Sequence, residues 1–174
     1  MMHEMDPKDF DKVYALMEES FPGDERRDYE GQKKLLSNPK YTVFVLPYDE
    51  KDQIKAFITV YRFDDFAFAE HFAVDPRSRS QGLGSAILEE LKKRLPCRIC
   101  LEAELPETKI AKRRIGFYER NGFYQNPYPY TQPPYSADRK SVPLRIMTTG
   151  RPLSKPEFLH IQSLLYREVY HVNG

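Results

Sequence analysis

The sequence predicts an α/β fold of the α+β type: a mixed, mainly antiparallel central sheet flanked by helices, with an extra C-terminal helix. The hydrophobic period changes from helical spacing near the N-terminus to alternation between residues 41 and 74. After residue 74, helical and extended segments alternate along the chain. The length of 174 residues fits one domain with a sizeable core, so a single domain over residues 1–174 is expected.

Two helices are expected first. Asp6 offers an N-cap and Pro7 suits the first helical position, and apolar residues then recur at helical spacing, so residues 7–20 are predicted to form an amphipathic helix. A Pro-Gly pair breaks it. A second, more polar helix is predicted over residues 25–37, because Pro39 disfavours helical backbone just before it.

The next segments have the period of two that is typical of strands. Tyr41–Pro47, Ile54–Phe63 and Phe66–Val74 are rich in β-branched and aromatic residues and predict three antiparallel strands. The polar stretch Tyr48–Gln53 predicts a hairpin turn between the first two. Pro76 ends this part of the sheet, because proline has no N–H to donate to a ladder.

The remaining elements alternate, with one irregular segment. Residues 126–143 combine prolines with tyrosines and predict a long ordered loop or a semi-rigid flap rather than a regular ladder. It could be a lid over an acceptor, a proline-rich interaction motif, or a cover for the sheet. The other expected elements are a helix over 84–94, a strand Arg98–Glu104, a helix over 107–120, a strand Leu144–Thr148 and a C-terminal helix over 154–170.

Composition excludes several classes of function. The net charge is +1, so no field of the whole chain would recruit nucleic acid or an anionic membrane. The N-terminus lacks the apolar region of a signal peptide, and no apolar run approaches the ~20 residues of a membrane span. A cytoplasmic protein without nucleic-acid or membrane partners is expected.

The two cysteines, Cys97 and Cys100, have the spacing of a redox motif or of half a zinc site. No second pair and no nearby histidine pair complete four zinc ligands. Because they lie in an apolar, alternating stretch, two buried or half-buried thiols and no metal site are expected.

The segment Arg79-Ser80-Gln81-Gly82-Leu83-Gly84 lies between a predicted strand end and a predicted helix start. Glycines there let the backbone approach a ligand closely, and amides at a helix N-terminus attract phosphate oxygens. Arg77 and Arg79 add positive charge nearby. A phosphate-binding loop is therefore predicted.

Two common nucleotide motifs fit this segment poorly. The Gly-Lys-Ser/Thr of a Walker loop is absent. A dinucleotide fingerprint would need a third glycine where Ile87 stands, and it would follow a βαβ strand rather than an antiparallel meander.

The run FAVDPRSRSQGLGSAILEEL instead resembles the acyl-CoA pyrophosphate motif of the GNAT N-acetyltransferase superfamily. A second run, RRIGFYERNGF, resembles the FYE-x-x-GF segment of that superfamily, and the order of elements agrees over about residues 1–125. The resemblance implies a GNAT-like fold and acetyl-CoA as cosubstrate. It implies that main-chain groups of Phe72, Ala73 and Val74 pair with pantetheine, and that Arg79, Gln81, Gly82, Leu83, Gly84 and Ser85 hold the pyrophosphate.

The same resemblance implies two catalytic residues. Tyr118 occupies the position whose hydroxyl protonates the departing thiolate, although it could be only a core aromatic. Glu70 lies on the strand that supplies a general base in related enzymes, and its aromatic neighbours predict a raised pKa; the alternative is a carboxylate without a proton-transfer role. In a regular strand His71 would point away from Glu70 and serve structurally.

Other residues leave alternatives open. Glu102 and Glu104 share one strand face and could hold a cationic acceptor, or be ordinary surface carboxylates. Ala111 and Arg114 depart from the asparagine and the small residue common in the family. Arg114 and its basic neighbours could contact the 3′-phosphate of coenzyme A, or be solvated.

The expected function is N-acetyl transfer from acetyl-CoA to a primary amine of a small molecule or a protein, by direct attack in a ternary complex. A non-catalytic acyl-CoA-binding or regulatory module is the main alternative, and a nucleotide-binding protein is a third. Edge strands and the C-terminal helix are compatible with a homodimer.

Overall fold

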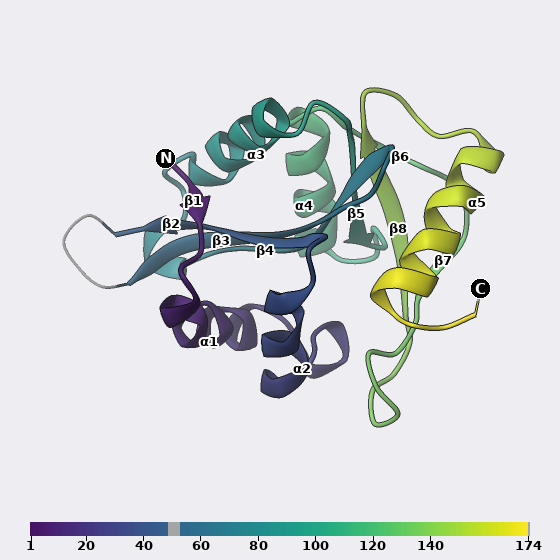
Figure 1. Ribbon diagram of the computed structural model, residues 1–174. Helices are drawn as coiled ribbons and strands as arrows, with labels where there is room; N and C mark the ends of the chain where they lie inside the picture. The colour runs from purple at the N-terminus through teal and green to yellow at the C-terminus, as the bar shows by residue number, and fades with distance from the viewer. Residues whose placement is uncertain (49–52, 174) are drawn as a thin grey trace. The chain divides into compact units, whose positions relative to one another are not determined.

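The computed structural model describes residues 1–48 and 53–173 (Figure 1). The chain divides into two compact units, Met1–Ile99 and Cys100–Gly174. Helices flank mainly antiparallel strands, so the predicted fold class is confirmed. The predicted turn over 48–53 lies mostly outside the described residues, and the single-domain organisation stays a prediction.

The first unit contains an antiparallel sheet in the order β1-β2-β3-β4. The strand β1 was not predicted, because two residues carry no periodic signal. The interior of β3 is almost entirely buried, which agrees with a sheet that is covered on both faces. The strands are β1 (His3–Glu4), β2 (Tyr41–Pro47), β3 (Ile54–Arg62) and β4 (Phe66–Val74).

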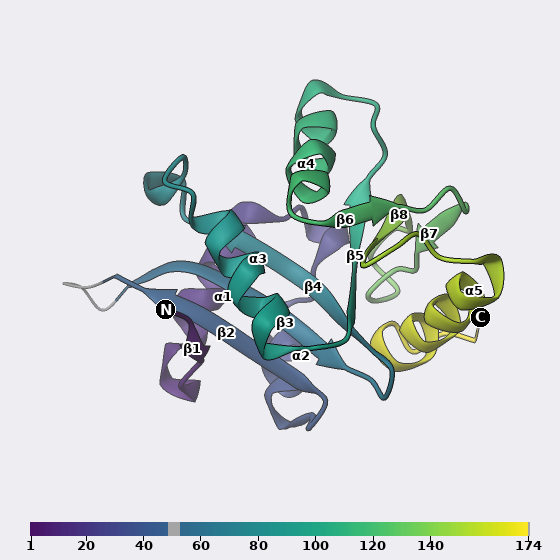
Figure 2. The same cartoon turned by 90° about the horizontal axis from the view of Figure 1, so that it is seen from above.

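Helices cover the two faces of this sheet. The helices α1 (Phe10–Ser20) and α2 (Tyr29–Lys34) lie on one face and α3 (Leu83–Arg94) lies on the other (Figures 1 and 2). A 3₁₀ turn η1 (Pro7–Asp9) precedes α1, and the Asp6 side chain accepts from the Lys8 amide, as its cap role predicts.

The predicted helix over 25–37 is wrong in extent. A separate 3₁₀ turn η2 (Gly23–Glu25) comes first, and α2 begins only after Asp28, whose side chain accepts from the Gly31 amide. Residues Leu35–Ser37 then form another 3₁₀ turn, η3. The helix begins at Tyr29 instead of residue 25 because Asp28 caps it, and residues 26–28 form an extended connection.

The second unit is organised around its longest strand, β8. The strands β5, β6 and β7 all pair with β8 in antiparallel register. The helix α5 begins with a capping box between Ser154 and Glu157 and ends in a π-helical turn, η5. The elements are β5 (Arg98–Glu104), α4 (Lys109–Arg120), β6 (Phe123–Gln125), β7 (Tyr130–Gln132), β8 (Val142–Thr149), α5 (Lys155–Leu164) and η5 (Leu165–Val169).

The Tyr/Pro segment 126–143 differs from the prediction. It contains the short strand β7, in which Tyr130 pairs with Leu144 of β8. Pro127, Pro129, Pro133 and Pro134 flank this strand rather than interrupt it, so they cost no ladder bond inside it. The Tyr128 ring stacks on Phe158 of α5 at 4.9 Å, and Tyr166 donates to the Thr131 carbonyl at 2.6 Å. The segment is therefore fastened to the C-terminal helix.

The two thiols have different surroundings. Cys100 is buried in β5, as expected, but Cys97 is exposed, because it lies in the short connection before that strand. Among the described residues, no helix is both long enough and apolar enough to cross a membrane.

Candidate active site

The loop between β4 and α3 has the backbone conformation of an anion-binding segment. A 3₁₀ turn η4 (Pro76–Ser78) is followed by Ser80 with φ 66° and Gly82 with φ 73°, the residue that caps α3. A Cβ built on Gly82 would meet nothing within 4 Å. Glycine is therefore favoured at position 82 because the backbone is left-handed there, and not because the protein lacks room for a side chain. The space in front of it is open to a ligand.

The amides at the start of α3 point out of the helix without helical acceptors. The first helical bond runs from the Ala86 amide to the Gly82 carbonyl at 3.1 Å, so the amides of Leu83, Gly84 and Ser85 precede it. No side chain caps this end. Because the helix dipole is positive here, these amides fit the oxygens of a diphosphate.

The two arginines near this loop differ in how much of their positive charge is compensated by the protein. Arg77 Nη2 lies 2.7 Å from Asp75 Oδ2, and hydrogen bonding from Arg77 lowers the pKa of the Asp75 carboxyl. Much of the charge of Arg77 is therefore compensated within the protein. Arg79 is exposed and donates from Nε to the Val74 carbonyl at 3.2 Å, so it links the loop to the end of β4.

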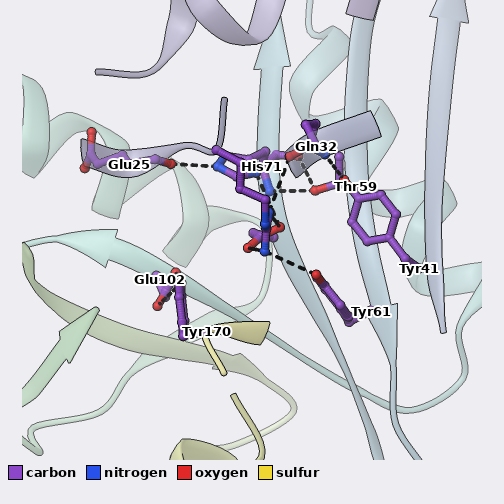
Figure 3. A network of polar contacts seen from close by, with 10 residues as sticks. Glu25, Gln32, Tyr41, Thr59, Tyr61, His71, Glu102 and Tyr170 are labelled. Carbon is purple, nitrogen blue, oxygen red and sulfur yellow. Dashed lines mark hydrogen bonds and ion pairs between the residues drawn. The ribbon is translucent and has the colours of Figure 1, made fainter. Parts of the chain in front are cut away.

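The strand β4 contains a bulge at Glu70 and His71. Ile58 of β3 pairs with Phe72, but Val60 pairs with Ala69, so two residues of β4 lie opposite Thr59 alone. The Thr59 hydroxyl accepts from the His71 amide at 2.9 Å (Figure 3). The bulge interrupts the alternation of side chains. His71 therefore does not point away from Glu70, as a regular strand would require: its Nδ1 lies 3.6 Å from Glu70 Oε1.

The Glu70 carboxylate is ion-paired in the interior. Arg27 Nη1 and Nη2 donate to its two oxygens at 2.9 and 3.0 Å, and the Glu70 side chain is 0% exposed. Burial alone would raise the pKa of Glu70, but the Arg27 guanidinium and the His71 ring outweigh it and lower that pKa. The predicted raised pKa is wrong, because the sequence does not show that Arg27 reaches this strand.

His71 has the structural role that was expected. Its Nε2 lies 2.7 Å from the Glu25 carbonyl (Figure 3). Its ring is 2% exposed, and the Phe21 ring packs edge-on against it. These contacts tie β4 to the connection between α1 and α2.

The segment Phe72–Val74 follows the bulge and leads to the phosphate loop. On one edge it pairs with β3, through Ile58, Phe57 and Ala56. Phe72 and Val74 are half-buried and Ala73 is buried. The role of this segment in holding pantetheine stays a prediction.

Tyr118 lies on α4, in the second unit. Its half-buried ring packs edge-on against Phe117 and Phe123 at 5.4 and 5.7 Å. Burial raises the pKa of Tyr118 to about 12, although Arg114 opposes the shift. The hydroxyl therefore stays protonated across the physiological range, and its acid role stays a prediction.

The two carboxylates of β5 already have partners in the protein. Glu102 accepts hydrogen bonds from Tyr130 at 2.5 Å and from Tyr170 at 2.7 and 2.8 Å (Figure 3 shows Glu102 and Tyr170). Glu104 pairs with Arg114. These contacts argue against a site for a cationic acceptor at Glu102 and Glu104, and they occupy Arg114. No local pattern marks Tyr170 as a partner of Glu102, because the π-helical turn η5 places it after α5.

Comparison with known proteins agrees with this geometry. The family described as "Acetyltransferase (GNAT) family" matches residues 10–123, more than half of the chain. A solved protein of Bacteroides thetaiotaomicron, assigned to the GNAT family of acetyltransferases, is 32% identical with a TM-score of 0.89, and the match covers 99% of each chain.

Two further proteins are similar. YjbC of Bacillus subtilis (strain 168), assigned as an acetyltransferase, is 28% identical over 112 residues, which are 63% of this chain. The match spans only 55% of the length of that curated relative. An aminoglycoside 6′-N-acetyltransferase solved with coenzyme A has the same fold, with a TM-score of 0.64, 16% identity and coverage of 88% of this chain and 99% of its own. The chain belongs to the GNAT family of acetyltransferases.

Proposed function

We propose that the protein transfers an acetyl group from acetyl-CoA to a primary amine of a small molecule or a protein, by direct attack in a ternary complex. The observation that carries this proposal is the start of α3, where Gly82 has φ 73° and three successive amides, Leu83 to Ser85, precede the first helical bond. An amide cluster of this kind suits a diphosphate.

The cosubstrate would be held by two neighbouring segments of the first unit. Arg79, Gln81, Gly82, Leu83, Gly84 and Ser85 would hold the diphosphate, and main-chain groups of Phe72, Ala73 and Val74 would pair with the pantetheine arm. Bound acetyl-CoA supplies the thioester carbonyl as the electrophile. Amides near Ala73 and Val74 would stabilise the oxyanion that forms on that carbonyl.

Tyr118 would act on the leaving sulfur. Its pKa of about 12 lies well above the ~8.5 of a typical thiol, so complete proton transfer to a free thiolate is unfavourable. A hydroxyl that keeps its proton is nevertheless a good hydrogen-bond donor to the charge that develops on sulfur. Tyr118 would therefore donate a hydrogen bond to the leaving sulfur, and the departing thiolate would take its proton from water.

Glu70 is the candidate base, and its ion pair makes it a weak one. The lowered pKa keeps the carboxylate ionised at neutral pH, ready to accept a hydrogen bond but poor at retaining a proton. Because its side chain is also 0% exposed, Glu70 would shape the main chain beside the acceptor rather than take up the proton of the amine, which would pass to water.

A non-catalytic acyl-CoA-binding module is the second candidate function. The weak basicity of Glu70 favours it.

Two measurements separate the candidates. Calorimetric titration with coenzyme A tests the cradle, and release of coenzyme A from acetyl-CoA with a panel of primary amines tests transfer. Turnover on any amine supports the enzyme, binding without turnover on the whole panel favours the module, and the absence of binding contradicts both.

A further inference from the structure

The bulge of β4 is fastened through both of its side chains to the connection between α1 and α2. Arg27 holds the Glu70 carboxylate with two hydrogen bonds, and the Glu25 carbonyl meets His71 Nε2 (Figure 3 shows the His71 contact). A bulge places two residues opposite one, so the ladder alone fixes it poorly. The contacts from Glu25 and Arg27 supply the missing constraint.

The guanidinium of Arg27 is itself held from several elements. Its Nη2 donates to the Tyr61 hydroxyl of β3 at 3.2 Å, and its Nη1 donates to Gln32 of α2 at 3.4 Å. The Tyr14 hydroxyl of α1 donates to the Arg27 carbonyl at 2.9 Å. The Arg27 side chain is only 10% exposed. These contacts fix the position of the charge that faces Glu70.

The bulge exposes main chain rather than side chain at Glu70. The Glu70 side chain is 0% exposed, yet the residue as a whole is half-buried, so its accessible surface belongs to the backbone. Phe72–Val74 continue directly from this backbone. The conformation of the bulge therefore sets where those three residues lie.

We propose that Arg27 is a positioning residue for acyl transfer, which acts through Glu70 to fix the main chain of the β4 bulge and of the segment Phe72–Val74 that follows it. This inference rests on the proposed function, since it takes Phe72–Val74 to line the bound acetyl-CoA. Arg27 orients the carboxylate of the candidate base and takes no part in bond making itself.

The test uses variants that separate charge from geometry. Arg27→Lys keeps the positive charge but loses the planar fork that grips both carboxylate oxygens. Arg27→Met combined with Glu70→Gln removes both charges, so no isolated charge remains in the interior. The control is Arg151→Met, because Arg151 is exposed and pairs with Glu157 rather than with a residue that holds Arg27 or the bulge.

Three readouts are compared in the full chain: kcat for amine acetylation, Kd for acetyl-CoA by calorimetry, and hydrogen exchange of the β4 peptide that contains the bulge. For Arg27→Lys, kcat is expected to fall about tenfold, since small displacements cost up to about 10²-fold. Acetyl-CoA affinity should be retained, and the bulge amides should exchange faster. The double variant should show the same pattern, and Arg151→Met should match the wild type.

Wild-type kcat and wild-type exchange in both Arg27 variants would overturn the inference, and so would an equal loss of kcat in Arg151→Met. If the wild type gives no heat with acetyl-CoA, the proposed function fails and the catalytic role of Arg27 fails with it. The exchange measurement still shows in that case whether Arg27 holds the bulge, so the two failures are distinguishable.

Discussion

Both terminal nitrogens of Arg27 contact Glu70: Nη1 lies 2.9 Å from Oε1 and Nη2 lies 3.0 Å from Oε2. The two residues lie 43 positions apart, and no local sequence pattern links them. This pair lowers the pKa of the Glu70 carboxyl and joins the connection between α1 and α2 to the bulge of β4.

Removal of Arg27 alone should destabilise the protein strongly. Arg27→Met leaves the Glu70 carboxylate buried without its main counter-charge, which typically costs about 3–5 kcal/mol of unfolding free energy. Adding Glu70→Gln should recover much of that loss. Urea denaturation measures both values.

Arg151→Met is the matched control, because the Arg151–Glu157 pair is exposed (61% and 31%) and such pairs contribute about 0–1 kcal/mol. Equal small losses in Arg27→Met and Arg151→Met would show that the buried pair does not stabilise the fold.

The stability contribution of Glu70 should be lost only in acid. Its folded pKa is lowered, so the contribution is fully present above the unfolded pKa of about 4.3 and declines as pH falls through the folded pKa. The difference in unfolding free energy between wild type and Glu70→Gln should therefore be constant from about pH 6 to pH 8. It should shrink below about pH 4. A difference that changes around pH 7 would contradict the ion-paired state.

Glycine at position 82 should be required for cofactor binding. Gly82→Ala places a Cβ on a left-handed residue, at a backbone cost of about 1–2 kcal/mol, and puts a methyl group in the open space before the amides. Calorimetry should show a large loss of coenzyme A affinity.

Gly150→Ala is the control for backbone strain, since Gly150 has φ 85° and also nothing within 4 Å of a built Cβ. It should cost similar stability and leave the affinity unchanged. Equal affinities in the two variants would exclude the Gly82 loop as the cradle.

Loss of the Tyr118 hydroxyl should slow turnover rather than weaken binding. For Tyr118→Phe, kcat should fall by about 10²-fold or more, the usual contribution of a positioned proton donor, with acetyl-CoA affinity retained. Tyr124→Phe, at an exposed position of β6, should have no effect on either value. An undiminished rate in Tyr118→Phe would remove the acid role and leave this tyrosine as a packing residue beside Phe123.

The features that could be predicted from the sequence are those set by local chemistry. The strand Phe66–Val74 and the Asp6 cap of the turn η1 before α1 follow from residue types that act on their own neighbours. The Arg27–Glu70 pair could not be predicted, because it joins residues 43 positions apart.

The remaining errors have physical causes of the same kind. The bulge at Glu70 and His71 arises from pairing with β3. A single extra residue in one strand cannot be recognised from the hydrophobic pattern. Tyr130 and Tyr170 meet at Glu102 because β7 and a π-helical turn place them there. Burial and ion pairing at such sites depend on tertiary contacts, so the pKa of Glu70 was predicted in the wrong direction.

The most direct test follows the amide resonances of Leu83, Gly84 and Ser85 by NMR while coenzyme A is added to the wild-type protein, with pantetheine as the comparison ligand. If these amides hold the diphosphate, their resonances shift with coenzyme A and stay in place with pantetheine, which lacks it. Resonances that do not move at saturating coenzyme A would contradict the account.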